Sequence, residues 1–127
     1  MRRLMIMTAM AMLLVGVFAA AAYARTFTCT DLPCYGTSDG DVIDERPAAG
    51  TPDEIFGRAG ADNINAGIYP SDRDILRGQN GNDRLNTDDG DGRDRVYGGE
   101  GTDTCRVDEG DAYFSCEAVY VDGVFLP

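Results

Sequence analysis

The feature that most restricts the possible folds of this chain is a repeat with a period of 20 or 21 residues. Four six-residue segments begin with glycine and end with aspartate, and they start at Gly36, Gly57, Gly78 and Gly98. Each aspartate precedes a triplet whose middle residue is Ile, Leu or Cys, and a second series of aspartates with similar triplets lies between the segments. Repeats of this length are typical of solenoids. We therefore expect a chain wound into coils, with two strands in each coil.

The triplets also predict which side chains form the core. Because side chains alternate along a strand, only the middle residue of each triplet can point inward. The two expected inward ladders are Ile43, Ile64, Leu85 and Cys105 in one, and Ile55, Leu76, Val96 and Tyr113 in the other. We predict an all-β fold in which two short parallel sheets face each other. A core this thin buries little apolar area for the number of residues it orders, so further stabilisation is needed.

The glycine-rich segments resemble a known family. GGEGTDTCR at 98–106 fits the pattern G-G-x-G-x-D-x-U-x, in which U is a large apolar residue. GQNGNDRLN at 78–86 and GRAGADNIN at 57–65 lack only the second glycine, and GTSDGDVID at 36–44 also has Asp39 at the inner glycine position. This pattern is similar to the nonapeptide repeat of hemolysin-type (RTX) calcium-binding proteins. The resemblance covers residues 36–114 and implies a parallel β-roll, a right-handed two-sheet β-solenoid of about four coils.

The resemblance also implies where calcium would bind. In such repeats each ion lies between successive turns on one edge, where closing aspartates and turn carbonyl oxygens supply the hard oxygen ligands that calcium prefers. Carried over to this sequence, about three ions lie between the consecutive aspartates Asp41, Asp62, Asp83 and Asp103. The turn glycines implied in these sites are Gly57, Gly60, Gly78, Gly81, Gly98 and Gly101. In the first turn, Asp39 could either add a ligand or disturb the backbone.

The loops that lead into the second series are longer and irregular, at 45–53, 66–74, 87–94 and 107–111. They keep an aspartate before each strand but lack the glycine spacing, so we expect mainly solvated acidic surface there. The secondary candidate ligands are Asp53, Asp74, Asp94 and Asp111, together with Asp39. A disordered acidic linker is the alternative for the whole pattern, but linkers do not keep their phase over four coils.

The start of the chain predicts export. Arg2 and Arg3 precede an apolar run that ends at Ala22-Tyr23-Ala24, which has the form of a signal peptidase site. We expect a signal peptide at 1–24 and a secreted protein with an N-terminal cap at 25–35, the β-roll at 36–114 and a C-terminal cap at 115–127. A retained membrane anchor is the alternative, and it would need flanks typical of a membrane span. After cleavage we expect no membrane association.

The four cysteines are an even number in a chain predicted to be exported, which favours disulfides. Four cysteines allow three pairings, and the short spacings favour Cys29 with Cys34 and Cys105 with Cys116. A zinc site is the alternative, but the chain has no histidine and its cysteines lack the paired short spacings of zinc ligands.

Charge and composition narrow the function. Removal of the leader lowers the number of basic residues from 11 to 9 and leaves all 22 acidic ones, a net charge of −13. With no lysine and no basic face, the chain is a poor nucleic-acid binder. The absence of histidine excludes histidine-based catalysis. We favour a non-enzymatic extracellular calcium-binding protein, structural or adhesive, whose folding depends on calcium. The alternative is a small calcium-dependent lyase that acts on polysaccharides. The sequence identifies no protein or polysaccharide partner.

Overall fold

The structure, a computed structural model, describes residues 24–30, 32–45 and 51–127. Residues 1–23 of the predicted leader therefore lie outside the described residues. Twelve strands occur in the part that is described: β1 (Thr26–Thr28), β2 (Cys34–Tyr35), β3 (Val42–Asp44), β4 (Glu54–Ala59), β5 (Asn63–Asn65), β6 (Ile75–Asn80), β7 (Arg84–Asn86), β8 (Arg95–Glu100), β9 (Thr104–Val107), β10 (Ala112–Phe114), β11 (Ala118–Val121) and β12 (Val124–Leu126). Among these residues there is no helix long and apolar enough to cross a membrane.

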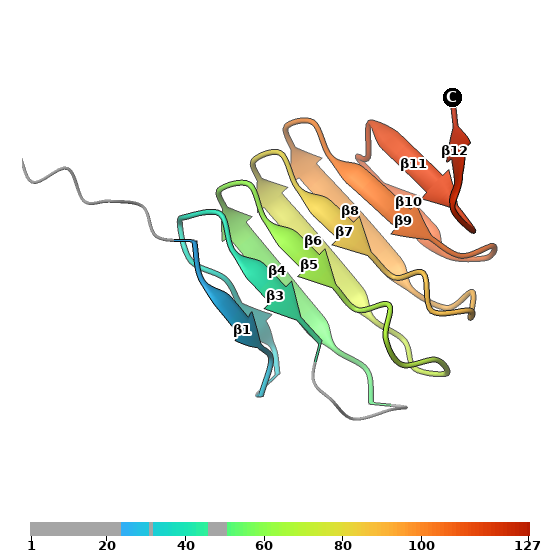
Figure 1. The fold of residues 1–127 in the computed structure, drawn as a ribbon, viewed down its shortest axis with the longest axis horizontal. Helices are drawn as coiled ribbons and strands as arrows, with labels where there is room; N and C mark the ends of the chain where they lie inside the picture. Colours follow the sequence, from blue (N-terminus) through green and yellow to red (C-terminus); the bar gives the residue numbers. More distant parts are fainter. Residues whose placement is uncertain (1–23, 31, 46–50) are drawn as a thin grey trace, which may run out of the picture.

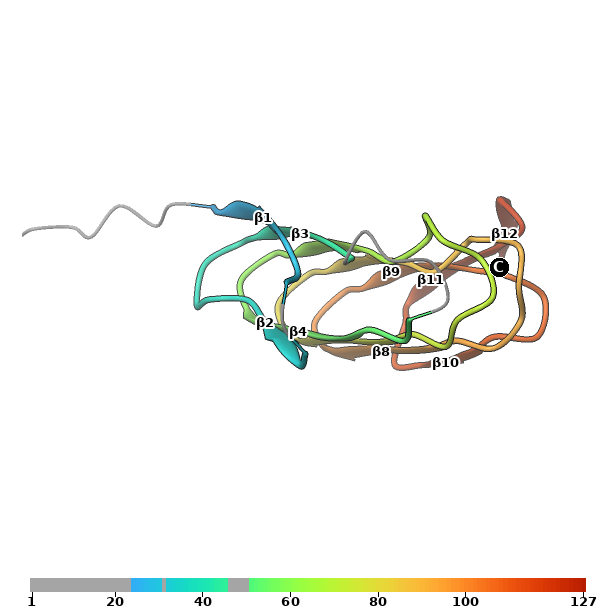
Figure 2. The ribbon, with the colours of Figure 1, turned by 90° about the horizontal axis from the view of Figure 1, so that it is seen from below.

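The strands form two sheets that lie one above the other (Figures 1 and 2). One sheet has the order β1-β3-β5-β7-β9-β11-β12, and the other has the order β10-β8-β6-β4-β2. All strand pairs are parallel except β11 with β12. The chain therefore crosses from one sheet to the other twice in each coil. The predicted all-β, two-sheet solenoid is confirmed.

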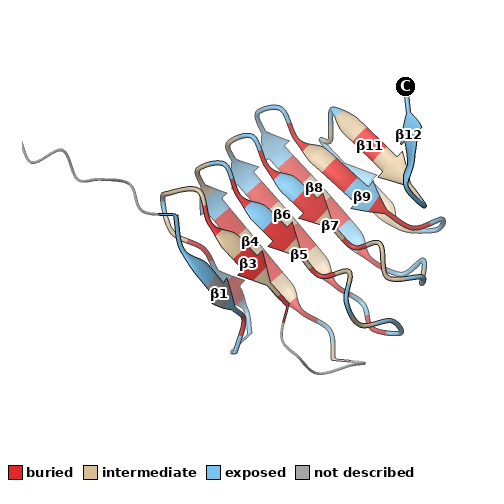
Figure 3. Cartoon of the chain, viewed as in Figure 1, coloured by how far each residue is buried: buried red, intermediate tan, exposed pale blue. Residues whose placement is uncertain are grey.

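The core is the pair of inward ladders between the sheets (Figure 3). Ile43, Ile64, Leu85 and Cys105 stand in register on β3, β5, β7 and β9, and each is at most 1% exposed. Val119 on β11 continues this ladder at the C-terminal end. The predicted ladder is therefore confirmed, and it extends one strand beyond the predicted repeats.

The opposite ladder differs from its prediction at both ends. Ile55, Leu76 and Val96 are fully buried and in register, as expected. Tyr113 is wrong as a core residue: it pairs with Val96 but is 39% exposed, because β10 is the last strand of its sheet and no strand covers its far side. At the other end the ladder begins with Cys34, which pairs with Ile55 and is buried.

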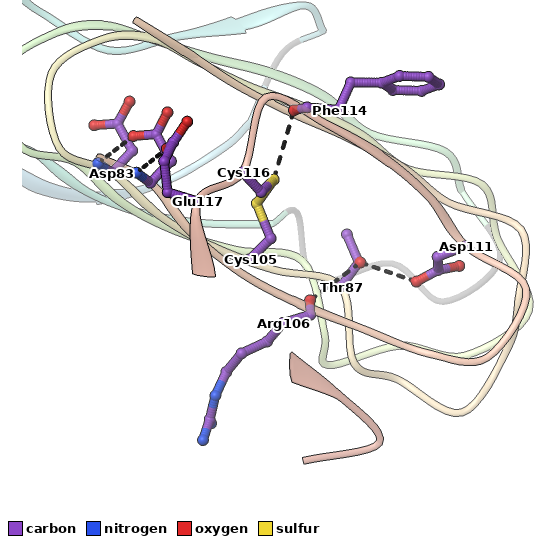
Figure 4. Close-up of a disulfide and its surroundings, with 9 residues drawn as sticks. Asp83, Thr87, Cys105, Arg106, Asp111, Phe114, Cys116 and Glu117 are labelled. Atoms are coloured by element: carbon purple, nitrogen blue, oxygen red, sulfur yellow. Dashed lines mark hydrogen bonds between the residues drawn. A yellow bond between two sulfur atoms is a disulfide. The ribbon is translucent and has the colours of Figure 1, made fainter. Parts of the chain in front are cut away.

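Both terminal segments join the sheets. The segment predicted as an N-terminal cap supplies β1 and β2, and the C-terminal one supplies β11 and β12. Disulfides link Cys29 to Cys34 and Cys105 to Cys116, which confirms the predicted pairing. The second of these fastens the segment between β10 and β11 to the inward position of β9 (Figure 4). Each end of the solenoid is thus closed by a covalent link.

Candidate metal sites on the two edges

One edge of the solenoid, called here the short-turn edge, consists of the turns at 36–41, 57–62, 78–83 and 98–103. The aspartates that close these turns are at most 1% exposed and are joined by hydrogen bonds from coil to coil. The backbone N–H of Asp41 donates to Oδ1 of Asp62 at 2.7 Å, and the N–H of Asp62 donates to Oδ1 of Asp83 at 2.8 Å. The N–H of Asp83 donates to Oδ1 of Asp103 at 2.8 Å. We call this series the short-turn ladder.

The short-turn ladder is completed at both ends by residues outside the repeats. At the C-terminal end the N–H of Asp103 donates to Oε2 of Glu117 at 2.7 Å, so Glu117 takes the place that the aspartate of a further coil would have (Figure 4). At the N-terminal end, Oδ1 of Asp41 accepts the N–H of Arg25 at 3.1 Å. The sequence pattern did not predict this role for Glu117, because it follows no glycine-rich segment.

The turn glycines are required by the close approach of neighbouring coils. Gly81 has a φ of +139°, and a side chain there would collide with the carbonyl group of Gly60 in the preceding coil. Gly101 has the same relation to Gly81, with a φ of +138°. Glycine adopts these backbone angles without steric cost and leaves room for the neighbouring backbone. Carbonyl oxygens of the glycines therefore lie in the gaps between turns.

The short-turn ladder leaves buried oxygens without hydrogen-bond donors. Oδ2 of Asp62, Asp83 and Asp103 is buried and accepts no hydrogen bond in the described part of the chain. Burial raises the pKa of all three carboxyls, that of Asp83 to about 6. A buried carboxylate without a donor is costly unless a cation or a proton neutralises it. These oxygens therefore fit a hard cation such as calcium, with the turn carbonyl oxygens as further ligands.

The first turn differs from the other three. Oδ2 of Asp41 accepts hydrogen bonds from the backbone N–H of Thr37 at 2.6 Å and from its hydroxyl at 2.9 Å. Asp39 does not adopt the positive φ that Gly60, its counterpart in the next turn, has. Because of the hydrogen bonds from Thr37, Oδ2 of Asp41 is not left without donors as Oδ2 is in the later turns.

The opposite edge, called the long-loop edge, has a ladder of the same kind. The N–H of Asp53 donates to Oδ1 of Asp74 at 2.7 Å, that of Asp74 to Asp94 at 2.7 Å, and that of Asp94 to Asp111 at 2.9 Å. Asp53, Asp74 and Asp94 are at most 2% exposed. The expectation that these residues are solvated is therefore wrong. The loops at 66–74, 87–94 and 107–111 follow one another along this edge (Figures 1 and 2).

The inserted loops place additional carboxylates around this second ladder. In the described residues, four groups of three carboxylates each have ligand atoms within 4.8 Å of one another. All four belong to the long-loop end of the solenoid, and they are Glu45–Asp72–Asp74, Asp72–Asp89–Asp91, Asp91–Asp94–Asp111 and Asp88–Asp108–Asp122. The short-turn ladder contributes to none of them. Each short turn has one carboxylate at the ladder position and neighbouring strands are about 4.8 Å apart, so three successive carboxylates are too far apart to form such a group.

Sequence reasoning missed these added carboxylates, because they stand at no constant spacing. Several of them hydrogen-bond to the loop of a neighbouring coil. Oε1 of Glu45 accepts the N–H groups of Ile68 and Tyr69 at 2.8 and 3.0 Å. Oδ2 of Asp91 accepts the N–H of Ser71 at 2.7 Å. One signal in the sequence could have indicated them: the loops contain more aspartates than a solvent-exposed loop requires.

Burial and mutual repulsion raise the pKa values of these groups. Burial raises the pKa of Asp74 to about 8, and the charges of Asp72, Asp94 and Glu45 raise it further. Burial raises the pKa of Asp94 and of Glu45 to about 7, again with added repulsion from neighbouring carboxylates. The long-loop edge therefore holds negative charge less easily than the short-turn edge when no cation is bound.

A third feature lies on the outer face of the seven-stranded sheet. A hollow of about 520 Å³ is lined mostly by polar side chains from β3, β5, β7 and β9, among them the carboxylate of Asp44, together with Val42, Leu85 and, from β11, Tyr120. Arg84 and Arg106 are the two cationic residues in its lining. This surface is separate from both edges and contains no carboxylate ladder.

The comparisons with known proteins agree with this geometry. The fold is that of a repeat protein, a two-sheet solenoid with buried aspartates in its turns. The family model described as RTX calcium-binding nonapeptide repeat (4 copies) matches residues 50–68, 71–91 and 88–113. The chain belongs to this family of calcium-binding repeat proteins. Searches of curated proteins and of solved structures gave no match.

Proposed function

We propose that the protein is an extracellular, non-enzymatic calcium-binding module whose folding is coupled to calcium. The observation that carries the proposal is the short-turn ladder, in which the buried Oδ2 atoms of Asp62, Asp83 and Asp103 accept no hydrogen bond from any described residue and lie beside glycine turns of the RTX type. Extracellular location is supported by the two disulfides, because oxidising compartments favour them. The repetitive architecture supports a structural or adhesive role.

We assign about three ions to the gaps of the short-turn edge. Asp62 and Asp83 would hold the middle ion, and Asp83 and Asp103 the next, with carbonyl oxygens of the turn glycines completing each set. The gap between Asp41 and Asp62 would be the weakest, because both oxygens of Asp41 already accept hydrogen bonds. When bound, calcium supplies positive charge that neutralises carboxylates which the fold has removed from water.

Coupling to folding follows from the balance of charge and core. Residues 25–127 have 9 arginines against 22 acidic residues, so the metal-free chain repels itself when the coils stack. The two inward ladders are thin, and the 15 glycines of residues 25–127 increase the entropy lost on ordering. Extracellular calcium modules typically bind at about 0.1 to 1 mM, well above cytosolic free calcium. The chain would therefore fold after it reaches the exterior.

Far-ultraviolet circular dichroism of the oxidised protein tests this proposal. We expect a largely disordered spectrum in chelator and a β-type spectrum as calcium rises to about 10 mM. The magnesium titration is the control, because magnesium requires a smaller octahedral site and should not replace calcium at equal concentration. A complete β-type spectrum in chelator, unchanged by calcium, would contradict the coupling.

A second candidate function is a small calcium-dependent lyase that acts on polysaccharides. The hollow on the seven-stranded sheet favours it, because its volume of about 520 Å³ and its two arginines suit an anionic sugar. The assay is double-bond formation from uronate polymers in calcium, with Arg84→Ala and Arg106→Ala as variants. Activity that either variant abolishes would replace the non-enzymatic proposal, and absence of activity on all uronate polymers tested would retain it.

A further inference from the structure

We propose a second row of calcium sites on the long-loop edge, centred on the buried aspartates Asp74 and Asp94 and completed by carboxylates of the inserted loops. One site consists of Glu45, Asp72 and Asp74, and the other of Asp91, Asp94 and Asp111. The nonapeptide glycine turns contribute to neither. The inference goes beyond the proposed function, because that function places its ions on the opposite edge.

The first observation is the convergence of three carboxylates at each site. Within each group the ligand oxygens lie within 4.8 Å of one another. Two oxygens bound to one calcium ion at about 2.3 to 2.6 Å are at most about 5 Å apart, so the spacing matches a shared ion. In each group two carboxylates come from one loop and the third comes from a neighbouring coil, so a bound cation would join successive coils.

The second observation is independent of the clustering. Asp74 is fully buried and Asp94 is 1% exposed, yet Oδ2 of each accepts no hydrogen bond among the described residues. Their Oδ1 atoms are fixed by the N–H groups of Asp53 and Asp74, so each carboxylate is held with one oxygen committed and the other open. Oδ1 of Asp91 is likewise buried without a donor, whereas its Oδ2 is held by Ser71.

The open oxygens need positive charge. In the part of the chain that is described, no arginine forms an ion pair with Asp74, Asp91 or Asp94. The ion pair between Arg77 and Glu54 joins two strands of the five-stranded sheet instead. The carboxylates of Asp91, Asp94 and Asp111, whose ligand atoms lie within 4.8 Å of one another, repel one another unless they bind protons or a metal.

The group Asp72–Asp89–Asp91 links the two sites. Asp72 also belongs to the first site and Asp91 also to the second, so the ions would be neighbours along the solenoid axis. The oxygen-only ligands favour a hard cation, and the irregular loops favour calcium over magnesium, because calcium tolerates flexible coordination by six to eight oxygens. Loop carbonyl groups and water would complete each shell.

The direct test uses the unaltered protein, crystallised in calcium, and anomalous diffraction that locates the metal. We expect calcium peaks within about 2.6 Å of Oδ2 of Asp74 and of Asp94, in addition to any on the short-turn edge. Peaks confined to the short-turn edge would overturn this inference and leave the proposed function intact. Peaks confined to the long-loop edge would support this inference and overturn the placement of ions in the proposed function.

Calorimetric calcium titration at pH 7.5 tests the same inference in solution. Asp91→Asn is the principal variant, because Asp91 is only partly buried and lies in two groups. We expect it to bind at least one ion fewer, or to bind the affected ions at least tenfold more weakly. The matched control is Glu109→Gln, which removes one charge from an exposed residue of the same edge that lies in no group. Equal stoichiometry and affinities within twofold for Asp91→Asn and this control would overturn the second row.

Discussion

The two edges of the solenoid have the same ladder of hydrogen bonds from backbone N–H groups to carboxylates, but they differ in the oxygen atoms that could bind a cation. On each edge the N–H of one aspartate donates to the carboxylate of the aspartate in the next coil, at 2.7 to 2.9 Å. The short-turn edge has one carboxylate per coil and glycines that bring carbonyl oxygens into the gaps. The long-loop edge lacks the glycine turns and collects several carboxylates instead. Because both edges have the aspartate ladder, the ladder is a feature of how the coils stack. The residues of each turn or loop determine which other oxygen atoms lie around it.

The two edges should respond very differently to a side chain at a turn glycine. Gly81→Ala should destabilise the calcium-loaded protein by about 3 kcal/mol or more, because the added carbon meets the carbonyl group of Gly60 and the φ of +139° is unfavourable for alanine. Gly90→Ala, on the long-loop edge, should cost only about 1 kcal/mol, because Gly90 has a φ of +95° but no atom within 4 Å of the added carbon.

Urea unfolding of both variants in 10 mM calcium measures this difference. Gly90→Ala serves as the matched control, since it makes the same chemical change at another positive φ. Comparable losses of stability in the two variants would mean that backbone conformation alone, and not the contact between coils, makes glycine necessary at the short turns.

The second largest difference between the edges should be in how the stability of the metal-free protein depends on pH. The pKa of Asp74 is raised to about 8 in the folded state, from an ordinary value near 3.8, so between these pH values the folded state keeps a proton that the unfolded state has lost. Stability from this group is therefore full below about pH 4 and is lost as the pH rises towards 8. Asp83, with a pKa raised to about 6, loses its contribution earlier in the same direction.

Urea midpoints in chelator between pH 5 and 8, in conditions that keep some folded protein present, test this expectation. Asp74→Asn should flatten the profile up to about pH 8, and Asp83→Asn only up to about pH 6. Calcium should weaken or reverse the slope in the unaltered protein, because it binds the deprotonated carboxylates. A profile in chelator that rises with pH would contradict the assigned direction for both edges.

The regular part of the molecule could be predicted from the sequence, and the irregular part could not. The spacing of Gly36, Gly57, Gly78 and Gly98 determines the coil. The triplets determine the inward residues, because side chains alternate and the polar outer residues of each triplet leave only the middle one to point inward. Tyr113 failed because the pattern of a strand does not reveal whether another strand will cover it. Neighbours across the sheet settle that question.

The acidic groups of the long-loop edge were inaccessible for a related reason. Asp72 and Asp91 differ in their distance from the following ladder residue, two positions before Asp74 and three before Asp94. A repeat search cannot align them, although stacking of the coils brings both into the same group with Asp89. Loop conformation therefore determines this candidate site, and sequence periodicity does not.

Within the short-turn edge, position in the ladder should decide the size of an effect on calcium binding. Asp83→Asn should weaken binding by about tenfold and Asp103→Asn by about threefold, because Asp83 lies between two turns of the repeat and Asp103 borders only one. Both substitutions keep an oxygen that can accept the ladder hydrogen bond and remove one charge. Equal losses in a calorimetric titration would argue against ions stacked between consecutive short turns.

The smallest expected effect concerns the second position of the nonapeptide. In the repeats that start at Gly57, Gly78 and Gly98 this residue has a positive φ, but only in the last of them is it glycine. Arg58 and Gln79 have φ values of 82° and 77°, and Gly99 stands at the corresponding place with 117°. A left-handed backbone is strained for residues with a side chain, so Gln79→Gly should stabilise the folded protein by about 1 kcal/mol. Gln79 is the better choice of the two, because Arg58 also lies over the ring of Tyr35 at 4.8 Å.

The matched control for Gln79→Gly is Asn80→Gly. Asn80 is also exposed near the end of β6, but its φ is not positive, so glycine there should destabilise the protein by about 0.5 to 1 kcal/mol through the entropy of the unfolded chain. The measurement is the urea midpoint in saturating calcium for both variants. Opposite signs would tie the stability of the short-turn edge to the backbone angle at this position. Destabilisation in both would mean that the unfolded chain's entropy outweighs the strain, and that the missing second glycine is no defect of these repeats.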